Sequence, residues 1–215
     1  YIGDAGTDDQ ATTDNVTIKN IMTSANPTST TIDAGWDWKR LYDINYFLDN
    51  CQKADVSDDV MAHWVGVARY YRAEFYMTMV KKYSDVPWCD HTLATNDDAM
   101  YGKRDSRETV MQHVMDDYQY AADNVKADQP KGAIDRWIVL ASMARTALYE
   151  GTYRKYHSEL NLQASADALI KKAADAASDI MQSGRYSIYN TGHPESDYAS
   201  LFNATDLTSN PEMIQ

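Results

Sequence analysis

The chain has 215 residues, of which 44% are apolar and 24% charged, a composition typical of a folded globular protein. Its 32 acidic and 20 basic residues give a formal net charge of −12, which argues against general binding to nucleic acid or to anionic lipid. No apolar run reaches the roughly 18 residues that a membrane-spanning helix needs, and a domain of this length can bury a sizeable core without a metal or disulfide.

The first 35 residues differ in composition from the rest of the chain. They are rich in Thr, Asp, Asn, Ala and Gly, with Pro27 inside the segment and Gly35 at its end. This composition predicts an ordered loop or a long arm. The helical period begins after Trp36.

Two helices and a connecting loop are predicted next. The first helix covers about residues 38–51 and the second about residues 60–83, followed by a loop over 84–104. In the second helix a stripe at spacings of three and four predicts a buried face: Trp64, Ala68, Tyr71, Phe75 and Met79.

Three further helices are predicted in the second half of the chain. One starts near residue 105, where Asp105 with Glu108 has capping-box spacing and Ser106 is a competing cap. The next runs from about residue 134 until Gly151 ends it, and the last runs from about 166 until Gly184 ends it. Residues 186–215 look loop-like, with packing anchors expected at Tyr189, Tyr198 and Phe202.

The two predicted helix ends resemble each other. Gly151 and Gly184 each precede a tyrosine by two positions and lie 33 positions apart, close to the 34-residue period of tetratricopeptide repeats. The sequence therefore predicts an all-α fold of tetratricopeptide-like stacked helix hairpins with long irregular loops.

Residue patterns of known catalytic sites are absent from the sequence. No two of the five histidines have the spacing of a helical zinc motif, and there is no Cys-x-x-Cys, no Gly-x-Ser-x-Gly and no phosphate-binding glycine loop. Cys51 and Cys89 can form one bridge or remain two buried thiols. Carboxylates are abundant, so a glycosidase pair is not excluded by counting. Asp8 and Asp9, in the polar arm, can bind calcium or sugar hydroxyls, although they lack the spacing of an EF-hand loop.

The aromatic content carries more information. Tyrosine outnumbers phenylalanine by 16 to 3, and there are five tryptophans. Such side chains combine a flat apolar face with a polar tip, which suits the stacking of sugar rings. Most are expected in the core, on apolar helical stripes: Trp64, Tyr71, Tyr118 and Trp137. Trp36, Trp88 and Tyr101 lie in predicted loops, where they either contact a ligand or cover helix ends.

Several sequence blocks resemble the SusD/RagB family. Residues 68–76 (ARYYRAEFY) and 80–87 (VKKYSDVP) are similar to the family pattern A-R-x-x-R-A-x-x-Y followed by Y-G-D-V-P, with Ser84 in place of the usual glycine. Further blocks follow in the family's order: residues 38–45, 104–110, 132–153 and the closing segments at 186 and 210–214.

This resemblance implies a largely helical surface lipoprotein of the outer membrane of Bacteroidota-type bacteria. Such proteins bind glycans, or in some cases peptides, and close as a lid over a SusC-like TonB-dependent transporter, and they are not enzymes. Because family members are much longer, residues 1–215 are expected to be the N-terminal, helical-repeat portion, with the C-terminal portion and the lipid anchor outside this chain.

The sequence thus favours a glycan-binding subunit for nutrient import. The open alternatives are a peptide-capturing homologue, a non-catalytic helical-repeat scaffold for a protein partner, and a glycoside hydrolase. The residues expected to contact glycan are Trp36, Asp8, Asp9, Trp88 and Tyr101. No catalytic residue, metal ligand or cofactor is predicted, with calcium as an open possibility.

Overall fold

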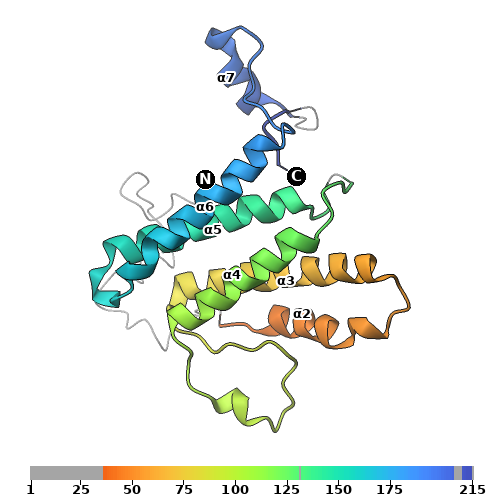
Figure 1. Cartoon of the computed structure of the whole chain (residues 1–215), viewed down its shortest axis with the longest axis vertical. Helices are drawn as coiled ribbons and strands as arrows, with labels where there is room; N and C mark the ends of the chain where they lie inside the picture. The colour runs from red at the N-terminus through yellow and green to blue at the C-terminus, as the bar shows by residue number, and fades with distance from the viewer. Residues whose placement is uncertain (1–35, 131, 206–209, 215) are drawn as a thin grey trace, which may run out of the picture. The chain divides into compact units, whose positions relative to one another are not determined.

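The computed structural model describes residues 36–130, 132–205 and 210–214. The chain divides into two units, residues 1–38 and 39–215. In the second unit the described residues form α-helices and short 3₁₀ helices (Figure 1): α2 (Lys39–Asn50), η1 (Cys51–Lys53), α3 (Asp58–Tyr83), η2 (Asp98–Tyr101), α4 (Arg107–Asn124), α5 (Arg136–Tyr156), η3 (Ser158–Leu160), η4 (Gln163–Ser165), α6 (Ala166–Gln182) and α7 (Pro194–Asn203).

The all-α prediction is confirmed for the part of the chain that the structure describes. That part contains no strand, and its one β-type contact is an isolated antiparallel bridge between Val86 and Asp105. No helix in the described part combines the length and the apolar composition that a membrane span requires.

The helices pack as two successive hairpins. α3 lies against α4, α5 lies against α6, and α4 joins the two pairs by packing on α5, while α2 lies along α3 (Figure 1). α3 and α5 run parallel, because Tyr70 on α3 contacts Ser142 on α5 at 3.3 Å and, further along both helices, the Lys81 ammonium lies 4.8 Å from the Tyr149 ring. This is the arrangement expected of stacked helix hairpins.

Two of the helix starts, those of α4 and α5, are fixed by short polar side chains. Ser106, the competing cap, begins α4, because its hydroxyl accepts from the Thr109 N–H at 3.2 Å. Asp135 begins α5 by accepting from the Ile138 N–H at 2.8 Å. Each bond satisfies an amide that the helix leaves unpaired.

The prediction that Gly151 ends a helix is wrong. α5 continues through it to Tyr156, and a Cβ at Gly151 would lie 2.8 Å from Ile170 Cγ1 and 3.0 Å from the Ala166 carbonyl oxygen. This glycine therefore permits a close approach of α6. Gly184 does follow the end of α6, with a φ of 66°. The two glycines thus have different roles.

The C-terminal segment is also more ordered than predicted. Residues 194–203 form α7, which has a proline in its first turn, as suits a helix start. Tyr198 and Phe202 contact each other with ring centroids 4.6 Å apart and planes tilted by 46°, but they are 76% and 68% exposed. They do not bury as the packing anchors that the sequence suggested, whereas Tyr189 is half-buried.

The predicted buried stripe of α3 is only partly correct. Ala68, Phe75 and Met79 are buried, but Trp64 is 53% and Tyr71 45% exposed. α3 meets α4 through the side that contains Gly66, and at 100° per residue the whole predicted stripe falls on the opposite side, where burial differs from one side chain to the next. The other two aromatics expected in the core, Tyr118 and Trp137, are buried.

Two clusters of buried charges hold the helices together. Asp117 on α4 accepts from Arg72 at 2.7 and 2.9 Å and from Arg69 at 2.6 Å, both on α3. Glu150 on α5 is fully buried and accepts from two further arginines, Arg107 of α4 at 2.6 Å and Arg154 of its own helix at 2.8 Å. The arginines of the 68–76 block are therefore structural.

Candidate functional site

A long loop joins α3 to α4 and extends away from their ends (Figure 1). α3 ends at Tyr83, and Ser84 follows with a φ of 63°, in the left-handed region that favours glycine. The loop closes where the Asp105 N–H donates to the Val86 carbonyl at 3.1 Å. Residues 87–104 thus leave the ends of α3 and α4 and return to them at one point, so the segment projects from the surface as a single loop.

Polar side chains of α2 fix the first part of this loop. Asn45, 1% exposed, donates from Nδ2 to the carbonyls of Cys89 at 3.0 Å and His91 at 3.1 Å. The Asp49 carboxylate accepts from the Thr92 N–H at 2.8 Å and from its hydroxyl at 2.7 Å. The loop backbone is therefore positioned by the helix beside it.

A buried tyrosine of α3 fixes the same stretch from the other side. The Tyr76 hydroxyl oxygen accepts from the Cys89 N–H at 2.6 Å, and its proton faces the Pro87 and Cys89 carbonyls, each 3.3 Å away. Burial raises the pKa of Tyr76 well above its ordinary value, so the phenol stays protonated. Arg72 adds a bond to the Asp90 carbonyl at 3.2 Å.

Trp88 lies at the base of the loop and is half-buried. Its ring centroid is 4.3 Å from that of Tyr76 at an interplanar angle of 31°, and 4.5 Å from that of His113 at 16°. These ring contacts tie the side chain to α3 and α4, so Trp88 anchors the base of the loop.

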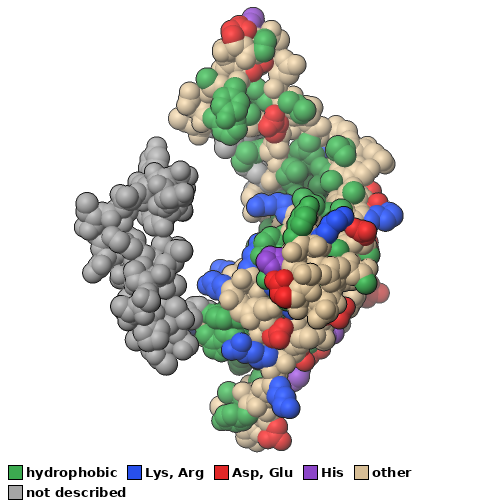
Figure 2. All heavy atoms as spheres, turned by 90° about the vertical axis from the view of Figure 1, so that its left-hand side faces the viewer, with side chains coloured by type: hydrophobic (Ala, Val, Ile, Leu, Met, Phe, Trp, Pro, Cys, Tyr) green, Lys and Arg blue, Asp and Glu red, His purple; other side chains and the backbone are tan. Residues whose placement is uncertain are grey.

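Tyr101 has the opposite environment at the far end of the loop. It is 84% exposed and ends η2, which Asp97 caps by accepting from the Ala99 N–H at 2.9 Å. Met100 beside it is 53% exposed. Figure 2 shows hydrophobic side chains gathered on this projection. The loop therefore presents a phenol ring to solvent on a backbone that is fixed at its base.

The other predicted contacts belong to the first unit. Trp36 is 42% exposed, and its ring meets that of Trp38 edge to face at 5.0 Å. Asp8 and Asp9 lie outside the described residues. The structure thus brings Trp88 and Tyr101 into one loop and leaves the predicted roles of Trp36, Asp8 and Asp9 as predictions.

Metal and thiol chemistry have little support in the described residues. They contain no group of three or more His, Cys, Asp or Glu side chains that could hold a metal ion. Cys51 and Cys89 are half-buried free thiols, so of the two alternatives predicted from the sequence the structure has the unbridged one. Burial raises the pKa of the Cys89 thiol, which lowers its reactivity.

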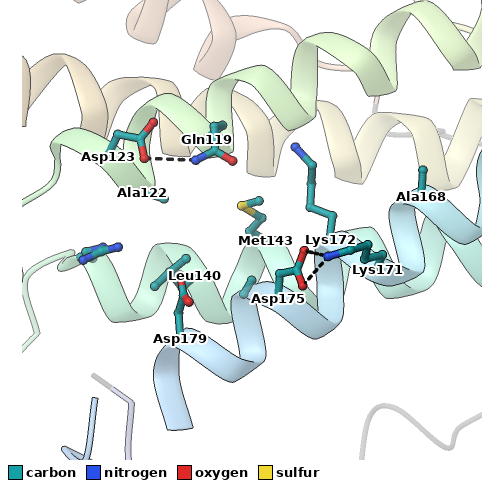
Figure 3. Close-up of a pocket in the computed structure, with 12 residues that line it drawn as sticks. Gln119, Ala122, Asp123, Leu140, Met143, Ala168, Lys171, Lys172, Asp175 and Asp179 are labelled. Carbon is teal, nitrogen blue, oxygen red and sulfur yellow. Dashed lines mark hydrogen bonds and ion pairs between the residues drawn. The ribbon is translucent and has the colours of Figure 1, made fainter. Parts of the chain in front are cut away.

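Two grooves between helices were not predicted from the sequence. The larger, about 590 Å³, lies between α3 and α5 and is lined by Glu74, Met77, Thr78, Lys81, Ser142, Arg145, Thr146, Leu148, Tyr149 and Thr152. The smaller, about 370 Å³, lies between α4 and α6, and α5 also contributes side chains to its lining. In the smaller groove Met143 and Leu140 come from α5, while Lys171 of α6 pairs with Asp175 at 2.6 Å (Figure 3). The signal that marks the larger groove is a pair of polar stripes at helical spacing, 74–78–81 and 142–145–149–152.

Comparison with known proteins gives matches in structure but not in sequence. No family model and no curated protein matches the chain. A SusD-like protein from Bacteroides fragilis matches 75% of this chain at 20% identity with a TM-score of 0.60, and 28% of that protein is covered. A SusD-like carbohydrate-binding protein from Bacteroides vulgatus matches 72% of this chain at 19% identity with a TM-score of 0.54, and 31% of it is covered.

A third similar structure was solved with xylogluco-oligosaccharide. It matches 71% of this chain at 21% identity, with a TM-score of 0.57, and 30% of that protein is covered. This chain therefore spans less than a third of the proteins that it matches. At these identities the likeness establishes the fold, which is SusD-like and all-α.

Proposed function

We propose that this chain is the helical-repeat portion of a surface glycan-binding subunit, which captures an oligo- or polysaccharide and delivers it to a SusC-like TonB-dependent transporter in the outer membrane. The binding is non-catalytic, and a lipid anchor holds the protein at the outer-membrane surface. The observation that carries the proposal is a fold shared with SusD-like proteins, one of them a carbohydrate-binding protein, combined with a firmly anchored loop that presents an exposed tyrosine.

The anchored loop suits the chemistry of sugar recognition. A sugar ring has an apolar face of C–H groups, which stacks on an aromatic ring, and a rim of hydroxyls, which bonds to short polar side chains. Tyr101 supplies an accessible ring and a hydroxyl at the last residue of η2, and Asp97 and Asp98 lie at the start of the same 3₁₀ helix. A fixed loop base reduces the ordering cost of binding, because less of the backbone has to be immobilised.

Delivery to a transporter fits a scaffold of this kind. Rigid stacked helices hold loops at fixed positions while a separate surface is available for a partner protein. A single sugar contact is weak, whereas a stable protein interface buries at least about 1,000 Å², so the transporter rather than the glycan would hold the complex together.

The test is a binding screen of the full-length protein by affinity gel electrophoresis and calorimetry. The panel contains neutral and acidic polysaccharides, xylogluco-oligosaccharide and a mixed peptide pool. For the glycan that binds, we expect Tyr101→Ala to weaken the affinity by about five- to tenfold, the loss of one aromatic stacking contact.

Tyr156→Ala is the matched control. Tyr156 is the last residue of α5 and is 79% exposed. Its removal takes away about as much exposed aromatic area as Tyr101→Ala does, but at a position outside the loop. Binding of peptides and of no glycan would replace the proposal by the peptide-capturing alternative. Failure of both would favour a protein-interaction scaffold, and release of reducing sugar would identify a hydrolase.

A further inference from the structure

The groove between α3 and α5 has an organised polar lining. On α5 the side chains of Ser142, Arg145, Tyr149 and Thr152 recur at spacings of three and four, so they form one stripe along the helix. On α3 the stripe is formed by Glu74, Thr78 and Lys81. Because the two helices run parallel, the stripes face each other along the whole groove.

The charge of this groove opposes that of the chain. Arg145 is exposed, and among the described residues no carboxylate lies within ion-pair distance of its guanidinium or of the Lys81 ammonium, which rests on the Tyr149 ring at 4.8 Å. The one acidic side chain in the lining, Glu74, accepts a hydrogen bond from the buried Tyr118 hydroxyl at 2.6 Å. Two cations without carboxylate partners thus occupy one groove of a chain with a net charge of −12.

The remaining lining groups suit a polyhydroxylated ligand. The Thr78 hydroxyl donates to the Glu74 carbonyl at 3.0 Å, and the Thr152 hydroxyl donates to the Leu148 carbonyl at 2.8 Å. With their protons engaged, both oxygens have lone pairs left to accept from a ligand hydroxyl. The Tyr149 ring, 37% exposed, adds a partly open aromatic surface.

From this geometry we infer that the α3/α5 groove binds an acidic oligosaccharide, a chain containing uronic acid units, with Arg145 and Lys81 contacting its carboxylates. The inference rests on the proposed function, since it names the class of glycan. A guanidinium and an ammonium form stronger, charge-assisted hydrogen bonds with carboxylates than with neutral hydroxyls, so they select acidic over neutral sugars.

An acidic peptide has the same charge but fits the groove less well. The walls are two helices, whose backbone groups are already bonded, so they offer no strand edge for an extended peptide. The apolar lining consists of Met77 and Leu148 with the tyrosine ring, which provides few pockets for peptide side chains. A hydroxyl-rich ligand uses more of the lining than a peptide would.

The test compares an oligogalacturonate with its methyl ester, which has the same sugar chain without the charge. We expect the full-length protein to bind the acid about tenfold more tightly, and Arg145→Gln and Lys81→Gln each to reduce most of that preference. Arg40→Gln and Lys82→Gln are the matched controls, because they remove the same charges from exposed positions outside the groove lining. Increasing salt should weaken binding of the acid and not of the ester.

Each outcome has a separate meaning. Equal affinities for acid and ester, or equal effects of groove and control variants, would overturn the inference while leaving glycan binding intact. A polyglutamate peptide that binds with the same dependence on Arg145 and Lys81, in place of oligogalacturonate, would also overturn it. If no glycan binds at all, the proposed function itself fails.

Discussion

The α3–α4 and α5–α6 hairpins have the same antiparallel form but are joined by different chemistry. In the first, the buried Asp117 carboxylate of α4 accepts from Arg69 and Arg72 of α3. In the second, small residues form the contact, with Gly151 of α5 closely facing Ile170 of α6 and Ala173 and Ala176 buried on α6. Long ion-paired side chains fix how two helices are aligned because their hydrogen bonds form only in one geometry. Small residues fix the alignment because the two helices can pack closely only where those residues lie opposite each other.

This difference has a consequence for the candidate site. Arg72 bonds to Asp117, donates to the Asp90 carbonyl of the loop and lies with its guanidinium 5.2 Å from the Trp88 ring. One side chain therefore couples the packing of the first hairpin to the position of the loop that presents Tyr101. The second hairpin has no such connection to the loop among the residues described.

The largest effect is expected from Asp117→Ala. The substitution leaves the Arg72 guanidinium buried without its carboxylate, and breaking a buried ion pair from one side costs about 3–5 kcal/mol of unfolding free energy. Urea denaturation followed by circular dichroism measures the change. Tyr101-dependent glycan binding should weaken as well, because the loop loses a support.

Asp116→Ala is the control for this variant. Asp116 is the neighbouring residue of α4 and is exposed, with Gln112 as its side-chain partner at 2.9 Å. Its removal should change the unfolding free energy by less than about 0.5 kcal/mol. If both alanine variants lost the same stability, the ion cluster would not be what joins the first hairpin.

A smaller effect is expected from Gly151→Ala, which adds a methyl group where α5 and α6 are closest. The clash with Ile170 Cγ1 and the Ala166 carbonyl outweighs the better helix propensity of alanine, so we expect a net loss of about 1–2 kcal/mol in thermal or urea unfolding. Gly66→Ala gives the comparison in the first hairpin, where the new Cβ meets only one methyl group within 3 Å, Val125 Cγ2 at 2.9 Å. A larger loss for Gly66→Ala would contradict this contrast between the hairpins.

The sequence predicted α2 to α6 and their packing class but not α7, because the first five helices have clear local patterns. Apolar spacing, the Ser106 cap and the Gly184 stop were sufficient to place α4 and α6 within a few residues. The prediction that Gly151 ends a helix was wrong, because a single sequence does not distinguish a glycine that ends a helix from one that lets a neighbouring helix pack closely. The difference depends on α6, which is distant in the chain.

The candidate site was less predictable. Trp88 and Tyr101 lie in one loop and look equivalent in sequence, yet Trp88 packs against Tyr76 and His113 while Tyr101 is exposed. Only the long-range contacts with α3 and α4 separate them. The same limit applies to the α3/α5 groove, whose two stripes become one surface only when the hairpins stack.

The smallest predicted effect is a pH dependence confined to the first hairpin. His63 of α3 is buried, and its Nδ1 accepts from the Lys126 N–H at 3.2 Å, so the neutral ring is the form that fits. Burial, with the Lys126 ammonium as a second cause, lowers the pKa of His63 from 6.5. Below pH 6.5 the unfolded chain therefore binds a proton that the folded chain resists, and the stability fully present above pH 6.5 decreases as the pH falls toward the folded pKa.

Hydrogen exchange between pH 7 and 5 measures this effect. We expect the α3 and α4 amides to open faster at the lower pH in the wild-type protein than in His63→Gln, whose amide retains an acceptor that does not titrate. The α6 amides serve as the internal reference, because neither α5 nor α6 contains a histidine; an equal pH response of both hairpins would assign the effect to the carboxylates of the whole chain.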